Sequence, residues 1–370
     1  MNNNTEIYLK RALQLAAKGR GLVSPNPLVG AVLVKNNRII GEGYHQYFGG
    51  DHAEIDALKN STESPEGSTL YVNLEPCSHF GKTPPCTKAL IKNRIKKVVA
   101  AMADPNPSVS GKGFEEMRKA GIEVETGLLE QESREINRAY LTRLKKDRPF
   151  IALKIAQTLD GKIASYTGQS KWITGEKARA FGRRLRFEYD VILVGINTIL
   201  SDNPSLNYPR TGIPQTLLSR KRYLKVILDS EARLPLPAKI WEEASRIVVA
   251  VAKKAPAGRL RCLEKKGAQI IVAGNQKIDL EKLLDFLYRQ EIGSVLVEGG
   301  AATNGSFIDA GLVDLVYLFQ APLIIGGEKA KTSVAGKGFA TPESALHLKL
   351  KSTRRFNADH LSIYINEENL

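Results

Sequence analysis

One histidine and two cysteines in the first half of the chain are residue types that hold a transition metal. His52 stands just before Glu54, and Cys77 and Cys86 follow farther along the sequence. An imidazole and two thiolates are three ligands for a tetrahedral zinc, and catalytic zinc sites leave the fourth position open for water. Zinc lowers the pKa of that water to about 7, which makes hydroxide available at neutral pH. The pattern predicts a catalytic zinc centre at His52, Cys77 and Cys86.

Glu54 is the candidate proton carrier of this centre. At the start of a helix, its carboxylate can turn toward a metal-bound water without binding the metal, and can pass protons from the water to a departing amine. His-x-Glu followed by Pro-Cys, here with Pro76-Cys77, is the signature of zinc deaminases, in which the glutamate is the general acid and base. Nucleobase deaminases usually place two residues between their cysteines, whereas residues 78–85 separate them here. The longer spacing predicts a different pocket rim and a different substrate class.

Three other interpretations of the cluster stay open at the level of sequence. The three residues lie within a short stretch by chance, or they hold a structural zinc, or His79 supplies a fourth ligand. A fourth protein ligand would close the site and abolish the chemistry. The chain would then be a zinc-stabilised binding protein.

A second candidate site is a run of small residues in the second half of the chain. Glu298 is followed by Gly299, Gly300, Ala301, Ala302, Thr303, Asn304 and Gly305, after an apolar strand predicted at residues 294–297. Small residues let a phosphate approach the backbone, and the free amides of a helix start attract it. The Gly-x-Gly-x-x-Gly fingerprint is absent, and a Gly-Gly pair is often a turn. A phosphate site and a plain turn are both compatible with this run.

Secondary-structure patterns in the first half alternate between helix and strand. Apolar residues at helical spacing predict an amphipathic helix over residues 5–18, and two short β-rich runs around Asn36-Asn37 predict a hairpin. Further strands are predicted at residues 69–73, 98–102 and 122–124, and helices at 52–59, 85–91 and 113–120. This alternation predicts an α/β layer architecture.

The second half repeats the alternation on a larger scale. A charged stretch ended by Pro149 places a domain boundary near residue 147, which gives domains of residues 1–146 and 147–370. Strands are predicted at residues 150–155, 191–194, 225–228, 247–251, 269–272, 294–297 and 313–319, and helices at 176–186, 258–266, 279–289 and 302–310. The order predicts a doubly wound α/β domain.

Composition narrows the functional classes further. The 370 residues are 42% hydrophobic and 25% charged, and 54 basic against 39 acidic residues give a net charge of +15. The surplus favours anionic partners, either phosphorylated metabolites or nucleic acid. Neither a signal peptide nor a run of about 18 apolar residues is present, so we expect a cytoplasmic protein without a membrane partner. Three cysteines, Cys262 among them, make a disulfide framework improbable and leave metal binding or catalysis as the uses to consider.

Motifs around the zinc pattern resemble the amino-terminal half of the RibD family, the bacterial bifunctional riboflavin-biosynthesis deaminases/reductases. They are His52-Ala53-Glu54, residues 75–79 with Gly81, residues 83–86, residues 24–27 with Val29-Gly30, residues 43–45 with Gly49, and residues 104–107. In that family the eight-residue spacing between the cysteines is the rule, and His79 is a loop residue. The resemblance implies a cytidine-deaminase-like three-layer domain. It also implies pyrimidine contacts from Asn26 and His45, and ribose-phosphate contacts from His79 and Lys82. A turn residue at Asn26 and a solvated charge at Lys82 are the plain alternatives.

The second half resembles the reductase domain of the same family, which is similar to dihydrofolate reductase in fold. The resemblance rests on Lys154, Ala156, residues 159–164, Ser170, residues 172–174, Asp190, Gly195, Thr198, Asp202, Pro204, Leu206, residues 228–230 and 298–300. It implies that NADPH contacts Ala156, Trp172, Thr198, Asp202, Ser230 and residues 299–305. It implies substrate contacts from Ser170, Arg186, Leu206, Arg210 and Glu298, and a catalytic role for Lys154. Three departures from the family pattern are Gln157, Asn197 and Pro209, and the last lengthens the loop before Arg210.

Some reductase residues have simpler alternatives. Trp172 would serve only the core, and Asp202 would only begin a turn before Asn203-Pro204. Lys154 is harder to explain in this way, because an unpaired ammonium inside an apolar strand is costly. We therefore expect a partner for it.

Together these features predict a bifunctional enzyme with Zn²⁺ and NADPH as cofactors. The first domain would deaminate a phosphoribosylated diaminopyrimidinone, and the second would reduce the ribosyl group to a ribityl chain. The resemblance also implies a homo-oligomer and no nucleic-acid partner. The alternative enzyme is a zinc-dependent tRNA deaminase with an accessory domain, which the positive charge would suit.

Overall fold

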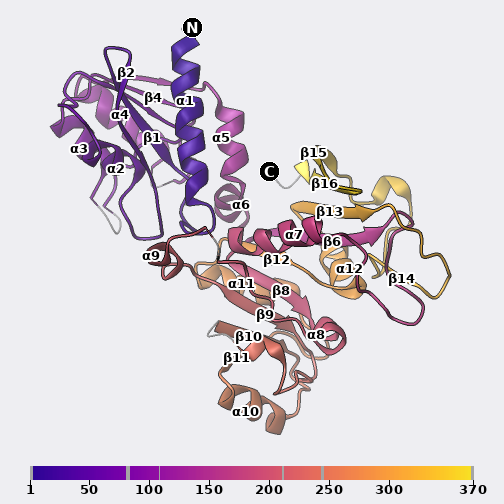
Figure 1. Ribbon diagram of the computed structural model, residues 1–370. Coiled ribbons are helices and arrows are strands. Elements are labelled where there is room, and N and C mark those ends of the chain that lie inside the picture. Colours follow the sequence, from indigo (N-terminus) through magenta and orange to yellow (C-terminus); the bar gives the residue numbers. More distant parts are fainter. Residues whose placement is uncertain (1–2, 81–83, 108, 211, 243–245, 368–370) are drawn as a thin grey trace. The chain divides into compact units, whose positions relative to one another are not determined.

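The computed structural model describes residues 3–80, 84–107, 109–210, 212–242 and 246–367 (Figure 1). The chain forms two compact units. The first comprises Met1–Lys146 and Gly212–Lys221, and the second comprises Asp147–Thr211 and Arg222–Leu370. A short stretch from the second half of the sequence therefore packs with the first unit, which a single boundary at residue 147 does not anticipate.

The first unit is built on a five-stranded sheet in the order β2-β1-β3-β4-β5. Its strands are β1 (Gly30–Lys35), β2 (Arg38–Tyr44), β3 (Thr69–Val72), β4 (Lys97–Ala100) and β5 (Glu123–Thr126). β1 pairs antiparallel with β2 and β3, and β3, β4 and β5 are parallel. The predicted hairpin at Asn36-Asn37 is confirmed, and both residues adopt the positive φ that a two-residue hairpin turn requires.

Helices cover both faces of this sheet. They are α1 (Asn3–Ala16), α2 (Ala53–Lys59), α3 (Cys86–Lys92), α4 (Lys112–Lys119), α5 (Glu130–Ile136) and α6 (Arg138–Lys146), with a 3₁₀ turn at Ala17–Gly19. Successive residues of β1 point to opposite faces. Leu33 packs in one core with residues of α2, α3 and α4, and Val32 packs in another with residues of α1. The unit is therefore three-layered, as predicted. Helices α5 and α6 were not predicted.

The second unit contains a nine-stranded sheet in the order β11-β10-β9-β8-β12-β6-β13-β16-β15. The strands are β6 (Phe150–Thr158), β8 (Val191–Gly195), β9 (Leu224–Leu228), β10 (Arg246–Val251), β11 (Ala268–Val272), β12 (Ser294–Val297), β13 (Leu315–Ala321), β15 (Lys349–Phe356) and β16 (Asp359–Ile365). The first seven positions pair in parallel, and β16 and β15 are antiparallel. All seven predicted strands are present, and the β15-β16 hairpin was missed.

Helices and short elements complete the second unit. The helices are α7 (Glu176–Glu188), α8 (Ile196–Asp202), α10 (Ala257–Lys265), α11 (Leu280–Arg289) and α12 (Ala301–Asp309), with 3₁₀ turns at Lys239–Trp241 and Pro342–Ser344. β7 (Lys162–Ala164) and β14 (Lys331–Thr332) form a two-stranded ribbon. Helix α9 (Gln215–Leu218) belongs to the stretch that packs with the first unit.

Edge strand β15 carries exposed basic side chains along its length. Lys349, Lys351, Arg354 and Arg355 are all exposed along it, and the Arg354 guanidinium lies over the rings of Phe181 and Phe356. The strand therefore ends the sheet with a row of basic side chains.

No helix among the described residues has the length and apolar character that crossing a membrane requires.

A buried ion pair holds the start of β6 to the turn before β13. Arg148 donates through both terminal nitrogens to the carboxylate of Asp314 at 2.7 Å each, and the amide of Ile151 donates to the same carboxylate at 2.7 Å. The Asp314 side chain is fully buried. Its loss would leave the buried Ile151 amide without this acceptor and the partly buried Arg148 with only the Pro149 carbonyl that Nη1 also binds.

We expect Asp314→Ala to destabilise the second unit by about 3–5 kcal/mol, the cost of breaking a buried pair by removing one partner. The measurement is urea unfolding followed by a probe of the second unit. Asp285→Ala, which removes the partner of Arg289 in an exposed helical pair, is the control and should cost less than about 0.5 kcal/mol. Equal losses in the two variants would contradict the role of Asp314.

Candidate functional sites

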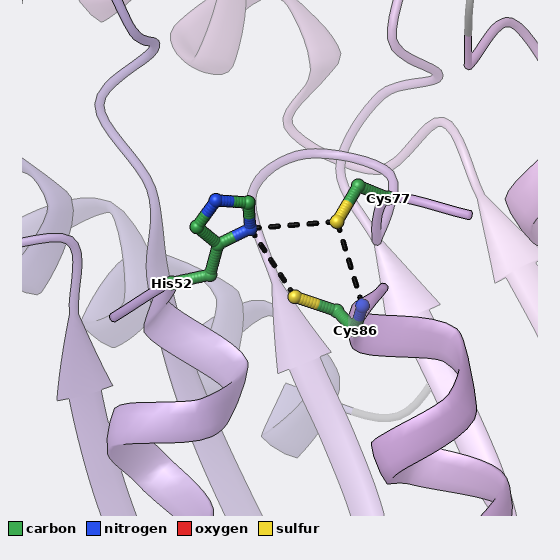
Figure 2. A group of neighbouring side chains, drawn as sticks. All are labelled: His52, Cys77 and Cys86. Atoms are coloured by element: carbon green, nitrogen blue, oxygen red, sulfur yellow. Dashed lines mark hydrogen bonds between the residues drawn. The ribbon is translucent and has the colours of Figure 1, made fainter. Parts of the chain in front are cut away.

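His52, Cys77 and Cys86 converge in the first unit (Figure 2). Nδ1 of His52 lies 3.4 Å from Sγ of Cys77 and 3.3 Å from Sγ of Cys86. Tetrahedral zinc with ordinary bond lengths would separate a nitrogen and a sulfur ligand by about 3.5 Å. The donor set and its spacing therefore fit a zinc ion.

The ends of secondary-structure elements position the three ligands. His52 is the residue before α2, Cys86 is the first residue of α3, and Cys77 lies in the loop after β3. The amide of Cys86 donates to Sγ of Cys77 at 3.4 Å. Two helix starts and one strand end thus place the three side chains together.

The charges of the cluster suit metal binding. The Cys86 thiol beside Cys77, together with the His52 imidazole, lowers the pKa of Cys77 to about 4 against the effect of burial. The Cys77 sulfur and burial raise the pKa of Cys86. The Cys77 sulfur also raises the pKa of His52 to about 9. Metal binding requires thiolates and a neutral imidazole, so protons leave this cluster when a cation enters.

Glu54 lies next to the three ligands and is buried, with 3% of its surface exposed. Burial raises the pKa of its carboxyl to about 6, although the neighbouring His52 imidazole opposes the shift. A carboxyl with a pKa near the working pH both accepts and releases a proton readily, as a general acid and base must.

Asn26 and His45, predicted as pyrimidine contacts, are hydrogen-bonded to each other. The His45 Nδ1 lies 2.8 Å from the carbonyl of Asp51, so this nitrogen carries the proton. The Asn26 amide can then donate to Nε2 at 3.1 Å. Burial lowers the pKa of His45 to about 4, so the ring is neutral at pH 7. Asn26 therefore does more than form a turn.

His79 is exposed, and among the described residues it is not part of the cluster that His52, Cys77 and Cys86 form. The structure therefore gives no support to a site closed by His79. Lys82 lies outside the described residues, so its predicted role stays a prediction.

Several supporting residues of this centre escaped the sequence analysis. Buried Glu75 accepts hydrogen bonds from the amides of Asp104, Gly111, Gly113 and Phe114 at 2.9–3.3 Å. These bonds hold the start of α4 against the loop that carries Cys77. A buried carboxylate directly before the Pro-Cys pair was the available signal, because such a group must find donors.

A second contact joins α4 to α3, the helix that begins at Cys86. The Thr87 hydroxyl donates to Glu116 of α4 at 2.7 Å, and the Thr87 amide donates to the carbonyl of Cys77 at 3.2 Å. A side chain at Gly113 would lie 2.2 Å from the carbonyl of Pro76. Helix α4 therefore packs directly behind both cysteines.

Cys77→Ser should leave the purified protein with less than about one tenth of the bound zinc, because a serine hydroxyl does not ionise near neutral pH as the thiol does. Metal analysis by plasma mass spectrometry is the measurement. Cys262→Ser, which changes an exposed cysteine, should keep full zinc content. Full occupancy in Cys77→Ser would remove Cys77 from the ligand set.

The second unit brings Lys154, Arg186 and Glu298 together. Arg186 donates from Nε and Nη2 to the two oxygens of Glu298 at 2.8 and 2.9 Å, and Nζ of Lys154 lies 3.9 Å from the same carboxylate. Burial would raise the pKa of Glu298, but Arg186 and Lys154 lower it to about 2. Because this pKa lies below the unfolded value, the carboxylate stabilises the fold above about pH 4 and loses that effect as the pH falls toward 2. The partner expected for Lys154 is therefore Glu298.

The other predicted substrate residues make contacts of their own. The Ser170 hydroxyl donates to Asp202 at 3.3 Å. Leu206 is buried, and its carbonyl accepts from the hydroxyl of Tyr223. Arg210 is exposed.

Trp172 is 67% exposed, with the guanidinium of Arg179 over its ring at 4.3 Å. The alternative that Trp172 only fills the core is therefore wrong. Asp202 ends α8 and accepts from Ser170, so it does more than begin a turn. Ala156 lies in β6, Thr198 in α8, and Ser230 just after β9.

The Gly-rich run connects β12 to α12, as predicted, with Gly300 as the residue before the helix. A side chain at Gly299 would overlap Thr303, whereas one at Gly300 would meet nothing within 4 Å. The backbone at Gly300 is therefore open to approach, next to the helix amides of Ala301 and Ala302. Thr303, Asn304 and Gly305 are buried inside α12, where the Asn304 amide donates to the carbonyl of Ser333.

Comparison with known proteins covers both units. A family model described as "RibD C-terminal domain" matches residues 149–362, and one described as "Cytidine and deoxycytidylate deaminase zinc-binding region" matches residues 2–102. The chain is similar to the riboflavin biosynthesis protein RibD of Actinobacillus pleuropneumoniae, at 41% identity over 97% of this chain and 94% of that protein. It is 43% identical to the RibD of Aquifex aeolicus, over 95% and 96% of the two chains.

Solved structures agree with this similarity. The structure of Acinetobacter baumannii RibD superposes with a TM-score of 0.88 at 35% identity, covering 98% of each chain. A diaminohydroxyphosphoribosylaminopyrimidine deaminase/5-amino-6-(5-phosphoribosylamino)uracil reductase from Thermotoga maritima superposes with a TM-score of 0.84 at 38% identity, over 98% and 99% of the two chains.

Proposed function

This chain belongs to the RibD family, and from that membership we propose that its two units perform consecutive steps of riboflavin biosynthesis. The first unit, which contains residues 1–146, converts 2,5-diamino-6-(5-phosphoribosylamino)pyrimidin-4(3H)-one to 5-amino-6-(5-phosphoribosylamino)uracil with release of ammonia. The second, which contains most of residues 147–370, reduces the ribosyl group of that uracil to a ribityl chain with NADPH. The observation that carries the proposal is the convergence of His52, Cys77 and Cys86 beside buried Glu54.

In the deaminase reaction, His52, Cys77 and Cys86 hold the zinc. Zinc bound there would supply a water that ionises near neutral pH. Glu54 would accept a proton from the attacking water and pass it to the departing nitrogen, while a carbon–oxygen bond forms and the carbon–nitrogen bond breaks. The neutral His45 ring and the Asn26 amide orient the pyrimidine, and His79 and Lys82 bind its ribose phosphate.

In the reductase reaction, Gly299 and Gly300 and the first amides of α12 receive the cofactor phosphates. Contacts from Ala156, Trp172, Thr198, Asp202 and Ser230 hold the rest of the cofactor. NADPH, when bound, supplies a hydride to the ribosyl carbon that carries the exocyclic nitrogen. The bond from that carbon to the ring oxygen breaks, and Lys154 supplies the proton that the oxygen gains.

Arg186 and Glu298 prepare the reductase site before substrate arrives. Their bidentate pair keeps two buried charges in fixed places. The Glu298 carboxylate also lies 3.9 Å from the ammonium of Lys154, which orients this group. Ser170, Leu206 and Arg210 complete the substrate contacts.

The tRNA deaminase alternative is not favoured. Its accessory domain would have no reason to match a reductase family over residues 149–362. The net charge of +15 suits a phosphorylated metabolite equally well. A homo-oligomeric state and a cytoplasmic location stay predictions from the sequence.

Glu54→Gln should keep zinc and lose deaminase turnover by at least about a hundredfold, because a carboxamide neither accepts nor releases a proton as a general base and acid near neutral pH. Ammonia release from the diaminopyrimidinone is the measurement. NADPH oxidation with the deaminated intermediate supplied directly should be unchanged. Equal loss of both activities would contradict two separate sites.

Lys154→Met should lower reductase turnover by about a hundredfold or more, because the side chain keeps its length and loses its proton. Lys282→Met, which changes an exposed lysine of helix α11, is the matched control. NADPH oxidation and ammonia release are measured on both. A Lys154→Met enzyme with full reductase turnover would show that another group donates the proton.

A further inference from the structure

The beginning of β9 reaches the segment that carries Leu206. Tyr223 and Lys225 are alternate residues there and project to the same side of the extended chain. The Tyr223 hydroxyl donates to the carbonyl of Leu206 at 2.7 Å, and Nζ of Lys225 donates to Oδ1 of Asn207 at 2.7 Å. Tyr223, directly before β9, and Lys225, within it, thus hold two consecutive residues of the segment.

Leu206 needs such support. Its φ of 58° lies in the left-handed region, which is unfavourable for a residue with a branched side chain. Its side chain is 2% exposed and cannot relax outward. A non-glycine residue persists in this conformation only when its surroundings determine it, and such residues cluster at functional sites.

Lys225 is the second unusual feature. It is among the largest fully buried side chains of the described chain, with no exposed surface. Burying an ammonium is costly, and an apolar residue of the same size would pack there at lower cost. Its nitrogen also lies 3.4 Å from the carbonyl of Ile240. An apolar side chain could not make the 2.7 Å bond to Asn207, which the ammonium does.

The contacts continue from Asn207 to the reductase centre. The Asn207 carbonyl accepts from Nη1 of Arg186 at 3.0 Å. The other two nitrogens of Arg186 bind Glu298, which lies beside Lys154. The position of Asn207 therefore determines the hydrogen bond of Nη1, the guanidinium nitrogen that does not bind Glu298.

We propose that Tyr223 and Lys225 are positioning residues of the reductase, which hold residues 206–207 in the conformation that the substrate and Arg186 require. The proposal rests on the proposed function of the second unit. Neither side chain needs to touch the substrate, because Tyr223 acts through the Leu206 carbonyl and Lys225 through Asn207.

Tyr223→Phe removes one hydroxyl and keeps the ring, which packs against Tyr208. We expect KM of the reductase for its uracil substrate to rise about threefold to tenfold, the effect of one lost hydrogen bond, with a smaller change in kcat. Deaminase turnover should not change. The control is Tyr288→Phe, which removes an exposed hydroxyl bonded to Asp147. A KM equal to that of the control, or an equal fall in both activities, would overturn the proposal.

Lys225 is tested with two substitutions. Lys225→Met removes the charge and should raise KM at least as much as Tyr223→Phe. Lys225→Arg keeps a cationic donor and should restore KM part of the way toward the wild-type value. A Lys225→Met enzyme with wild-type KM would remove Lys225 from the positioning role, and Tyr223→Phe decides the proposal if Lys225→Met does not fold.

Hydrogen–deuterium exchange gives a measurement that does not depend on activity. Amides of residues 205–208 should exchange at least about threefold faster in Tyr223→Phe than in the Tyr288→Phe control, while those of β12 stay unchanged. Unchanged exchange at residues 205–208 would overturn the proposal. If the wild-type protein did not reduce the uracil, the proposed function would fail, and the exchange result would still decide whether Tyr223 holds the segment.

Discussion

The first unit depends on one requirement, which is that the imidazole of His52 and the sulfurs of Cys77 and Cys86 lie within reach of a single metal ion. The three ligand atoms belong to three segments separated in sequence, so helices α2 and α3 and the loop after β3 must meet at one point. Glu75 and the Thr87–Glu116 bond hold α4 against the loop that carries Cys77 and against α3, which begins at Cys86. Outer contacts of this kind commonly change metal affinity by about tenfold to a hundredfold when lost.

The second unit also brings together polar side chains from separate segments, and here the charges pair with one another. Arg186, Glu298 and Lys154 come from α7, from the end of β12 and from β6, and each is at least partly buried. Fixed charges in a protected site act on a reacting group without first having to reorganise. The two units thus both depend on buried polar groups whose hydrogen bonds leave little freedom to move.

Local patterns predicted much of this architecture and the metal ligands. The seven parallel strands of the second unit were predicted from apolar runs. The residue types of His52, Cys77 and Cys86 predicted a metal site. Strand β15 was missed because Lys349–Phe356 is mostly charged and shows no apolar run, and α5 was missed because its sequence is mostly polar. The Arg186–Glu298 pair joins residues 112 positions apart. Such a pairing follows from the tertiary fold, which no local pattern contains.

The basic edge formed by β15 has a consequence for the solubility of a large sheet. An unprotected edge strand offers free amides and carbonyls to the edge of another molecule. Lys349 pairs with Glu367, and Lys351 and Arg355 are also exposed along the strand. A second copy that approached this edge would bring like charges together, and their repulsion disfavours strand addition at β15.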